Sequence, residues 1–139
     1  MTISHSSSSV LAALVLLVGP AAAQDAAPPP RPVHLASGSV ATLIETIWES
    51  GSEGRLGRYR FLVPAIARAT PTMAEVEADL VQLCREQAVP HMAIAGQTAD
   101  RLVISMSAEA IAFGDSRPDV TQFFEAFVLQ DGDCMVEVF

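Results

Sequence analysis

The best-marked element in the sequence is a helix that begins at Thr72, which is followed three positions later by Glu75. This spacing forms a capping box, in which each side chain satisfies a backbone N–H group of the first turn. Apolar residues then recur on one helical stripe: Met73, Val76, Leu80, Leu83 and Cys84. Because Pro90 would interrupt a helix, we predict a helix over residues 72–87. A helix with one apolar stripe needs a second layer to cover that stripe, and the flanking segments decide what this layer is.

A strand is predicted before the helix, at residues 58–63, where the segment RYRFLV alternates in character. Its three apolar residues share one face of the strand, and Arg58 and Arg60 share the other. Pro64 follows and ends the strand, because proline has no N–H group to donate to a neighbouring strand.

The segment before this strand, GSVATLIETIWES, has two interpretations. Its apolar residues fit the spacing of an amphipathic helix, but its many Val, Thr, Ile and Trp residues favour a strand. The turn-rich stretch GSEGRLG follows, and a strand–turn–strand unit explains both halves together. We therefore interpret residues 40–49 as a strand, with the helix as the open alternative.

The residues after the helix predict further strands. The segment DRLVISMS alternates and reads as a strand, and AIAFGDSRPD reads as a short extended piece followed by a loop. The segments TQFFEAFVLQ and CMVEVF flank Asp-Gly, which is a strong hairpin signal. We expect the three phenylalanines of the first segment, Phe123, Phe124 and Phe127, in the core. The order of elements predicts an α+β domain, in which one main helix packs on one face of an antiparallel sheet.

The N-terminus resembles a secretory signal. Residues 10–18, VLAALVLLV, are too few to span a membrane, which takes about 20 residues, but they fit the apolar region of a signal peptide. Ala21 and Ala23 give the small-residue pattern that precedes cleavage. We therefore expect residues 1–23 to be a signal peptide cleaved after Ala23, and a periplasmic or secreted protein. The first nine residues contain no Lys or Arg, so a misassigned start and a disordered apolar N-terminus are the alternatives.

Residues 24–32, QDAAPPPRP, are rich in proline and predict an extended linker. Residues 33–139 would then form a single domain. All sixteen acidic residues and all eight arginines follow residue 23, so the net charge of −8 belongs to this part of the chain. Such a surface repels phosphate backbones, and we expect no nucleic-acid partner. No second long apolar run is present, so no membrane span is expected after cleavage.

The two cysteines, Cys84 and Cys134, predict a disulfide. An exported chain meets an oxidising environment, in which an even cysteine count favours pairing. Cys84 lies on the apolar stripe of the helix and Cys134 begins the last strand, so a bond would join helix and sheet. The alternatives are two free buried thiols and a zinc site that adds His91 and His34, which lacks the close ligand spacing of structural zinc motifs. We expect no metal and no cofactor.

Several stretches taken together resemble a family of small exported bacterial proteins of unknown function. They are SGSVATLIETIWE, RYRFLVPAI, LCREQAVP, VISMSAEAIAFG, TQFFEAF and DCMVEVF, and they extend over nearly all of residues 33–139. RFLVPAI and TQFFEAF carry most of the resemblance. It implies a signal-bearing single domain with two cysteines near these positions, and it transfers no catalytic residue.

Arg58 and Arg60 are the candidate ligand-binding residues. They lie side by side on one strand face of an acidic chain. One interpretation pairs them with Glu45 or Glu49 on a neighbouring strand. The other is a site for a small anion or carboxylate, since guanidinium groups bind carboxylates through paired hydrogen bonds.

No catalytic motif is found in the sequence. His34 and His91 could act as general bases, but neither has a nucleophile partner in a recognisable pattern. We therefore expect a non-enzymatic binding or accessory module whose partner is a protein or a small anionic ligand. One alternative is a small periplasmic hydrolase that uses His91 or His34 with a nearby carboxylate. A second is a ferredoxin-like small-molecule-sensing regulatory domain.

Overall fold

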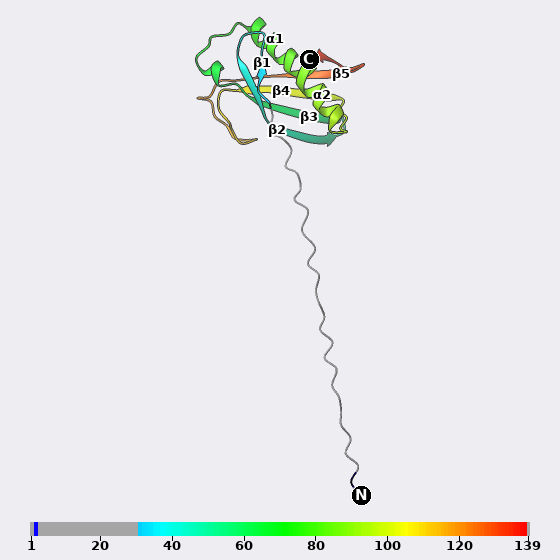
Figure 1. Ribbon diagram of the computed structural model, residues 1–139. Coiled ribbons are helices and arrows are strands. Elements are labelled where there is room, and N and C mark those ends of the chain that lie inside the picture. The colour runs from blue at the N-terminus through cyan, green and yellow to red at the C-terminus, as the bar shows by residue number, and fades with distance from the viewer. Residues whose placement is uncertain (1, 3–30, 139) are drawn as a thin grey trace.

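The computed structural model describes residues 2 and 31–138, which fold around one six-stranded sheet (Figure 1). The strands lie in chain order: β1 (Val33–His34), β2 (Val40–Gly51), β3 (Gly54–Leu62), β4 (Arg101–Ser107), β5 (Gln122–Gln130) and β6 (Asp133–Val136). The predicted signal peptide and nearly all of the predicted linker lie outside the described residues. The strand interpretation of residues 40–49 is confirmed, and the helix alternative is wrong.

The sheet is mixed, which corrects the prediction of an antiparallel one. Strands β3 and β4 run parallel, and the other neighbouring pairs are antiparallel. The parallel pair arises because the chain leaves β3, crosses the sheet through the helical segment and re-enters beside β3 in the same direction. The extended piece expected after β4 is not a strand, and residues 108–121 form a loop between β4 and β5.

The predicted helix is confirmed, but it continues beyond its predicted end. The capping box is present: the Glu75 N–H group donates to Thr72 Oγ1 at 3.3 Å, and the Thr72 N–H group donates to Glu75 Oε2 at 2.7 Å. Three segments follow without a break: α1 (Met73–Leu83), a π-helical turn η2 (Cys84–Ala88) and α2 (Val89–Ile94). A short 3₁₀ helix, η1 (Pro64–Ala67), lies between β3 and α1.

Pro90 does not end the helix because the backbone before it is π-helical. The Val89 N–H group donates to the Cys84 carbonyl, five residues back, instead of making the usual bond. Pro90 then lies in the first turn of α2. At this position the hydrogen bond that proline cannot donate costs the helix least. Such π-helical turns occur mostly as single-turn bulges inside α-helices. The prediction of an end before Pro90 is therefore wrong.

The core lies between the sheet and the helical segment, which crosses over the strands in Figure 1. It is built from alternate strand residues and the helical stripe: Tyr59, Phe61, Leu102, Ile104, Met106, Phe127, Val76, Leu80 and Leu83. Met73 is an exception to the predicted stripe, because 73% of it is exposed at the first position of α1. The alternation predicted for β3 and β4 is confirmed.

Cys84 and Cys134 form the predicted disulfide, with 6.3 Å between their Cα atoms. The bond joins the π-helical turn to β6, so the zinc and free-thiol alternatives are wrong. The predicted hairpin is also confirmed. Asp131 and Gly132 both have positive φ angles, 51° and 78°, as a two-residue turn between twisted strands requires.

Among the helices of the described residues, none has the length and apolar character needed to cross a membrane.

Candidate binding groove on the outer face of the sheet

A groove suited to binding lies on the sheet face that points away from the helical segment. Strand alternation places Tyr59 and Phe61 toward the helices and Arg58 and Arg60 on the opposite face. On that face the loop of residues 108–121 and three strands enclose a groove of about 360 Å³. We call it the outer-face groove; its main lining residues are Arg58, Arg60, Val103, Ser105, Phe113 and Phe124.

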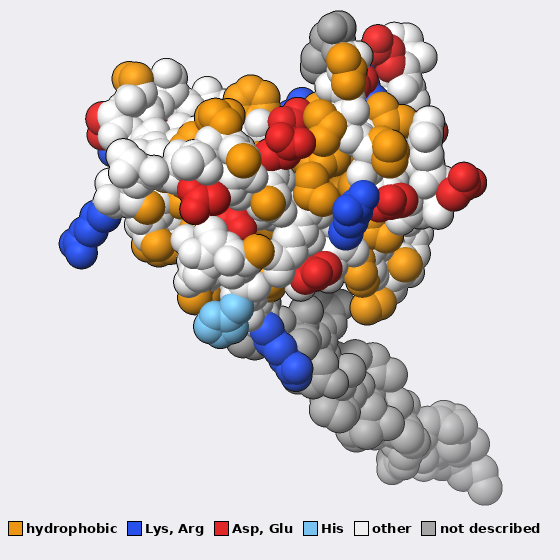
Figure 2. Space-filling model, turned by 90° about the horizontal axis from the view of Figure 1, so that it is seen from above, with side chains coloured by type: hydrophobic (Ala, Val, Ile, Leu, Met, Phe, Trp, Pro, Cys, Tyr) orange, Lys and Arg blue, Asp and Glu red, His pale blue; other side chains and the backbone are white. Residues whose placement is uncertain are grey.

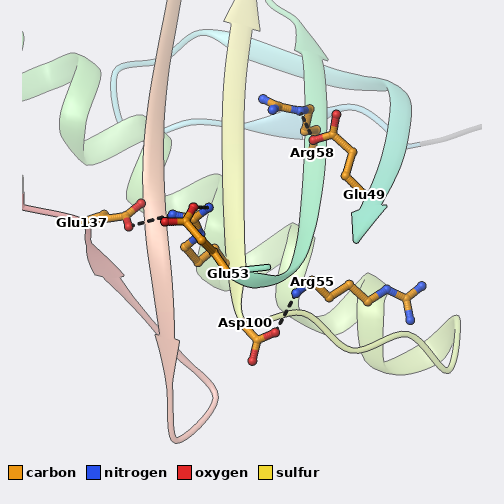
Figure 3. A network of polar contacts seen from close by, with 7 residues as sticks. Glu49, Glu53, Arg55, Arg58, Asp100 and Glu137 are labelled. Carbon is orange, nitrogen blue, oxygen red and sulfur yellow. Dashed lines mark hydrogen bonds and ion pairs between the residues drawn. The ribbon is translucent and has the colours of Figure 1, made fainter. Parts of the chain in front are cut away.

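Arg58 makes one ion pair and keeps donors unused. Its Nε donates to Glu49 Oε2 at 2.8 Å, and Figure 3 shows this pair bridging β2 and β3. Within residues 31–138, the Nη1 and Nη2 groups of Arg58 have no hydrogen-bond partner. The guanidinium carbon lies 5.5 Å from the centre of the Phe113 ring, a cation–π distance. The Arg58 guanidinium is therefore positioned in the groove by Glu49 and Phe113. Its two terminal nitrogens can still donate hydrogen bonds to a ligand.

Arg60 has a different role, because its guanidinium is occupied. It pairs with Glu45 across the strands and donates from Nη2 to the Ile111 carbonyl at 2.6 Å. Its guanidinium carbon also lies 5.7 Å from the centre of the Phe113 ring. Arg60 thus holds the loop against the sheet. The ion pairs expected with Glu45 and Glu49 are confirmed, and the anion site stays a prediction.

Two phenylalanines in the groove leave much of their rings uncovered. Phe113 is 52% exposed and Phe124 is 74% exposed. The expectation that all three phenylalanines of β5 lie in the core is therefore wrong for Phe124. Phe127 is fully buried, but Phe124 occupies an alternate position on the strand and so faces the groove.

The charged residues that line the groove balance in sign. Arg58 and Arg60 supply two positive charges, and Asp115 and Glu125 supply two negative ones. Glu45 and Glu49 lie beside the arginines and add further negative charge nearby. The groove therefore does not attract anions over a distance, and selectivity has to come from short contacts.

Within residues 31–138, His91 makes no hydrogen bond or ion pair with a carboxylate. Its Nδ1 is 3.1 Å from the hydroxyl oxygen of Tyr59, and burial raises the pKa of Tyr59 to about 12. The phenol therefore stays protonated at neutral pH and remains hydrogen-bonded to His91. The hollow that His91 lines measures about 150 Å³, and no Asp or Glu among the described residues contributes to it.

His34 lies in a different hollow, so the structure does not bring the two histidines into one site. This hollow also contains Glu86 and Arg85. The His34 side chain is exposed and makes no hydrogen bond to a carboxylate within residues 31–138. In the same part of the chain, no group of three or more His, Cys, Asp or Glu residues could hold a metal ion.

A second set of charged residues ties the strand ends together (Figure 3). Arg101 donates to Glu137 and to Glu53, each at 3.1 Å. Its pKa is raised further, mainly by the hydrogen bond and charge of Glu137, so it remains a cation. Asp100 accepts from the backbone N–H group of Arg55 at 2.7 Å. These contacts join the β2–β3 turn, the start of β4 and the end of the described chain, and their role is structural.

The comparison with protein families gives one match. The model of DUF6497, a family of unknown function, matches residues 14–139. The chain belongs to this family. The resemblance to a family of unknown function is thereby confirmed. No curated protein and no solved structure matches the chain.

The DUF6497 match includes every residue of the groove. Only Arg58 and Arg60 were identified from the sequence as site residues, and the two exposed phenylalanines, Phe113 and Phe124, were not. Phe124 could have been found by strict alternation in TQFFEAF, since Phe123 and Phe127 share one face and Phe124 takes the other. Phe113 has no comparable signal. It lies in a loop, and only the folded chain brings it over Arg58 and Arg60.

Proposed function

We propose that this DUF6497 chain is a non-enzymatic binding or accessory module, and that the outer-face groove is its recognition site. The observation that carries the proposal is the pairing of two exposed phenylalanine rings with a partly unsatisfied arginine in one concave space. Ligand pockets typically measure about 300–1,000 Å³ and combine apolar walls with a few polar groups. The groove has this size and this composition.

The surface of the molecule also supports a binding role. On the face drawn in Figure 2, hydrophobic side chains lie exposed in several places, with charged side chains among them. On the groove side, Phe113 and Phe124 expose large aromatic areas. Exposed aromatic groups in a concave space favour association, because covering them removes apolar area from water.

We propose that the module acts after export, in the periplasm or as a secreted protein. The predicted signal peptide motivates this proposal, and the Cys84–Cys134 disulfide supports it. Structural disulfides persist mainly in oxidising compartments. Mass spectrometry of the mature protein from a cell envelope fraction would test it, with Gln24 as the expected first residue.

The alternative functions have less support. A hydrolase needs a histidine beside a carboxylate. Of the two histidines in residues 31–138, only His34, which shares a hollow with Glu86, comes near that arrangement. A ferredoxin-like regulator has the order β-α-β-β-α-β. The described chain has a single helical crossover, between β3 and β4.

The proposed function is tested by mapping where small molecules bind. Isotope-labelled protein would be titrated with a pool of apolar, aromatic, anionic and cationic compounds while backbone amide NMR signals are recorded. We expect shifts to cluster on Val103, Ser105 and Phe124, and to be smaller in Phe124→Ser at the same compound concentrations. Ile94→Ser, which changes an exposed apolar residue on α2, is the matched control and should retain them. Shifts confined to His34 and Glu86 would instead support the hydrolase.

A further inference from the structure

We propose that the outer-face groove takes an apolar monocarboxylate, a carboxylic acid whose ring or short chain lies against Phe113 and Phe124 while Arg58 binds the carboxylate. This inference rests on the proposed function and narrows it to one class of ligand. Three features of the groove support it: the free donors of Arg58, the balance of charged side chains and the position of the two phenylalanine rings.

The free donors favour Arg58. Arg60 already donates from both Nη groups, to Glu45 and to the Ile111 carbonyl, so a ligand there would compete with the loop anchor. Arg58 uses only Nε, on Glu49. Its Nη1 and Nη2 groups form the end-on fork of a guanidinium, whose two parallel donors match the two oxygens of a carboxylate.

The charge balance limits the ligand to one negative charge. Arg58 already neutralises Glu49, and the carboxylates of Asp115 and Glu125 also line the groove. A second negative charge on the ligand would meet these groups without a further free cation, and like charges brought together are costly. A carboxylate therefore fits better than a phosphate ester or a dicarboxylate.

The position of the rings requires an apolar body next to the charged group. Phe113 lies within cation–π distance of Arg58, so a carboxylate on Arg58 has an aromatic surface directly beside it. Phe124 exposes most of its ring to the same space. A ligand ring packed against these phenylalanines gains apolar burial and aromatic contacts, neither of which acetate can make.

Four probes separate these requirements. Calorimetry and amide NMR would be run with 3-phenylpropionate, its neutral analogue 3-phenylpropanamide, acetate and phenyl phosphate. We expect 3-phenylpropionate to bind at least about tenfold more tightly than the amide, because a charge-assisted hydrogen bond is stronger than a neutral one. Acetate and phenyl phosphate should bind more weakly than 3-phenylpropionate.

Matched variants identify the residues responsible. Arg58→Gln should remove the preference for carboxylate over amide, and Phe124→Ser should weaken both probes by about three- to tenfold. Arg85→Gln is the control for Arg58→Gln, because Arg85 is a partly exposed arginine whose ion pair with Asp133 lies outside the groove. It should leave binding unchanged. Circular dichroism would verify that each variant is folded.

Each contrary result has a distinct meaning. Equal binding of 3-phenylpropionate and its amide, with shifts in the groove, would overturn the ligand class and leave the proposed function intact. A carboxylate preference that survives in Arg58→Gln would overturn the role of Arg58 and with it this inference. If neither the four probes nor the broader pool shifts any groove signal, both the inference and the proposed function are wrong.

Discussion

Gly57 shows how closely the core is packed around a single position of β3. A Cβ atom built on Gly57 would lie 2.6 Å from Cζ3 of Trp48 and 2.9 Å from Cδ2 of Leu102. Both neighbours belong to strands that flank β3. The absence of a side chain therefore lets the Trp48 and Leu102 side chains pack over this residue.

We expect Gly57→Ala to lower the free energy of unfolding by about 1–3 kcal/mol, because overpacking forces neighbouring side chains out of their preferred positions. Gly51→Ala is the matched control, since a Cβ atom there has no neighbour within 4 Å. Urea unfolding monitored by the fluorescence of Trp48 gives both values. Equal stability of the two variants would contradict this account of the packing.

Glu75 is hydrogen-bonded to Thr72 at the start of α1. The pKa of its carboxyl group therefore differs between the folded and the unfolded chain. Its pKa is lowered, first by the backbone hydrogen bond from Thr72 and then by that residue's hydroxyl. A carboxyl group whose pKa is lower in the folded state stabilises the fold above its unfolded pKa. This contribution is lost as the pH falls through the folded pKa.

We therefore expect Glu75→Gln to be less stable than the native chain at pH 7 and to approach it in stability below about pH 4. Glutamine preserves the capping geometry and removes only the titration. Urea midpoints measured across this pH range provide the test. Glu77→Gln, on the same helical turn but outside the capping box, serves as the control. A stability difference that stays constant with pH would show that the charge of Glu75 is irrelevant.

At the scale of elements, local patterns predicted the strands and the helix start well. The alternation in RYRFLV and DRLVISMS, the capping box and the Asp-Gly turn each depend on residues close in sequence, and all are confirmed. The end of the helix was predicted wrongly, because proline ends a regular α-helix but not one with a π-helical turn before it. The sequence carries no comparably local signal for that turn.

The loop of residues 108–121 is the element that completes the candidate site. It is held by the Arg60 bond to the Ile111 carbonyl and by the stacking of Phe113 on two arginines. Arg58 and Arg60 could be named from the sequence because they break the apolar pattern of β3. Phe113 could not, since its contacts join residues more than fifty positions apart.

For the whole molecule, the disulfide is the main covalent constraint. Cys84 and Cys134 are separated by 50 positions, and both are buried. A bond that closes a loop of this length restricts the unfolded chain and stabilises the fold by about 4 kcal/mol at most.

We expect the double variant Cys84→Ala, Cys134→Ala to lose about 2–4 kcal/mol of unfolding free energy. Guanidinium unfolding with and without reductant measures the loss, and native protein in reductant should match the variant. Intact mass after alkylation gives an independent check. Thiols that react before reduction in folded native protein would mean that the bond is not formed.

The sequence by itself indicated every strand except β1, where the helix begins, how the last hairpin turns and which two cysteines pair. These features follow from side-chain chemistry over a few residues, or from there being only two cysteines. The tertiary structure decided the parallel pairing of β3 with β4, the course of the helix past Pro90 and the closing of the groove by Phe113. The parallel pairing and the groove depend on contacts between segments far apart in the chain. Their stability comes from many contacts that form only when the whole chain has folded, so no short stretch of sequence can indicate them.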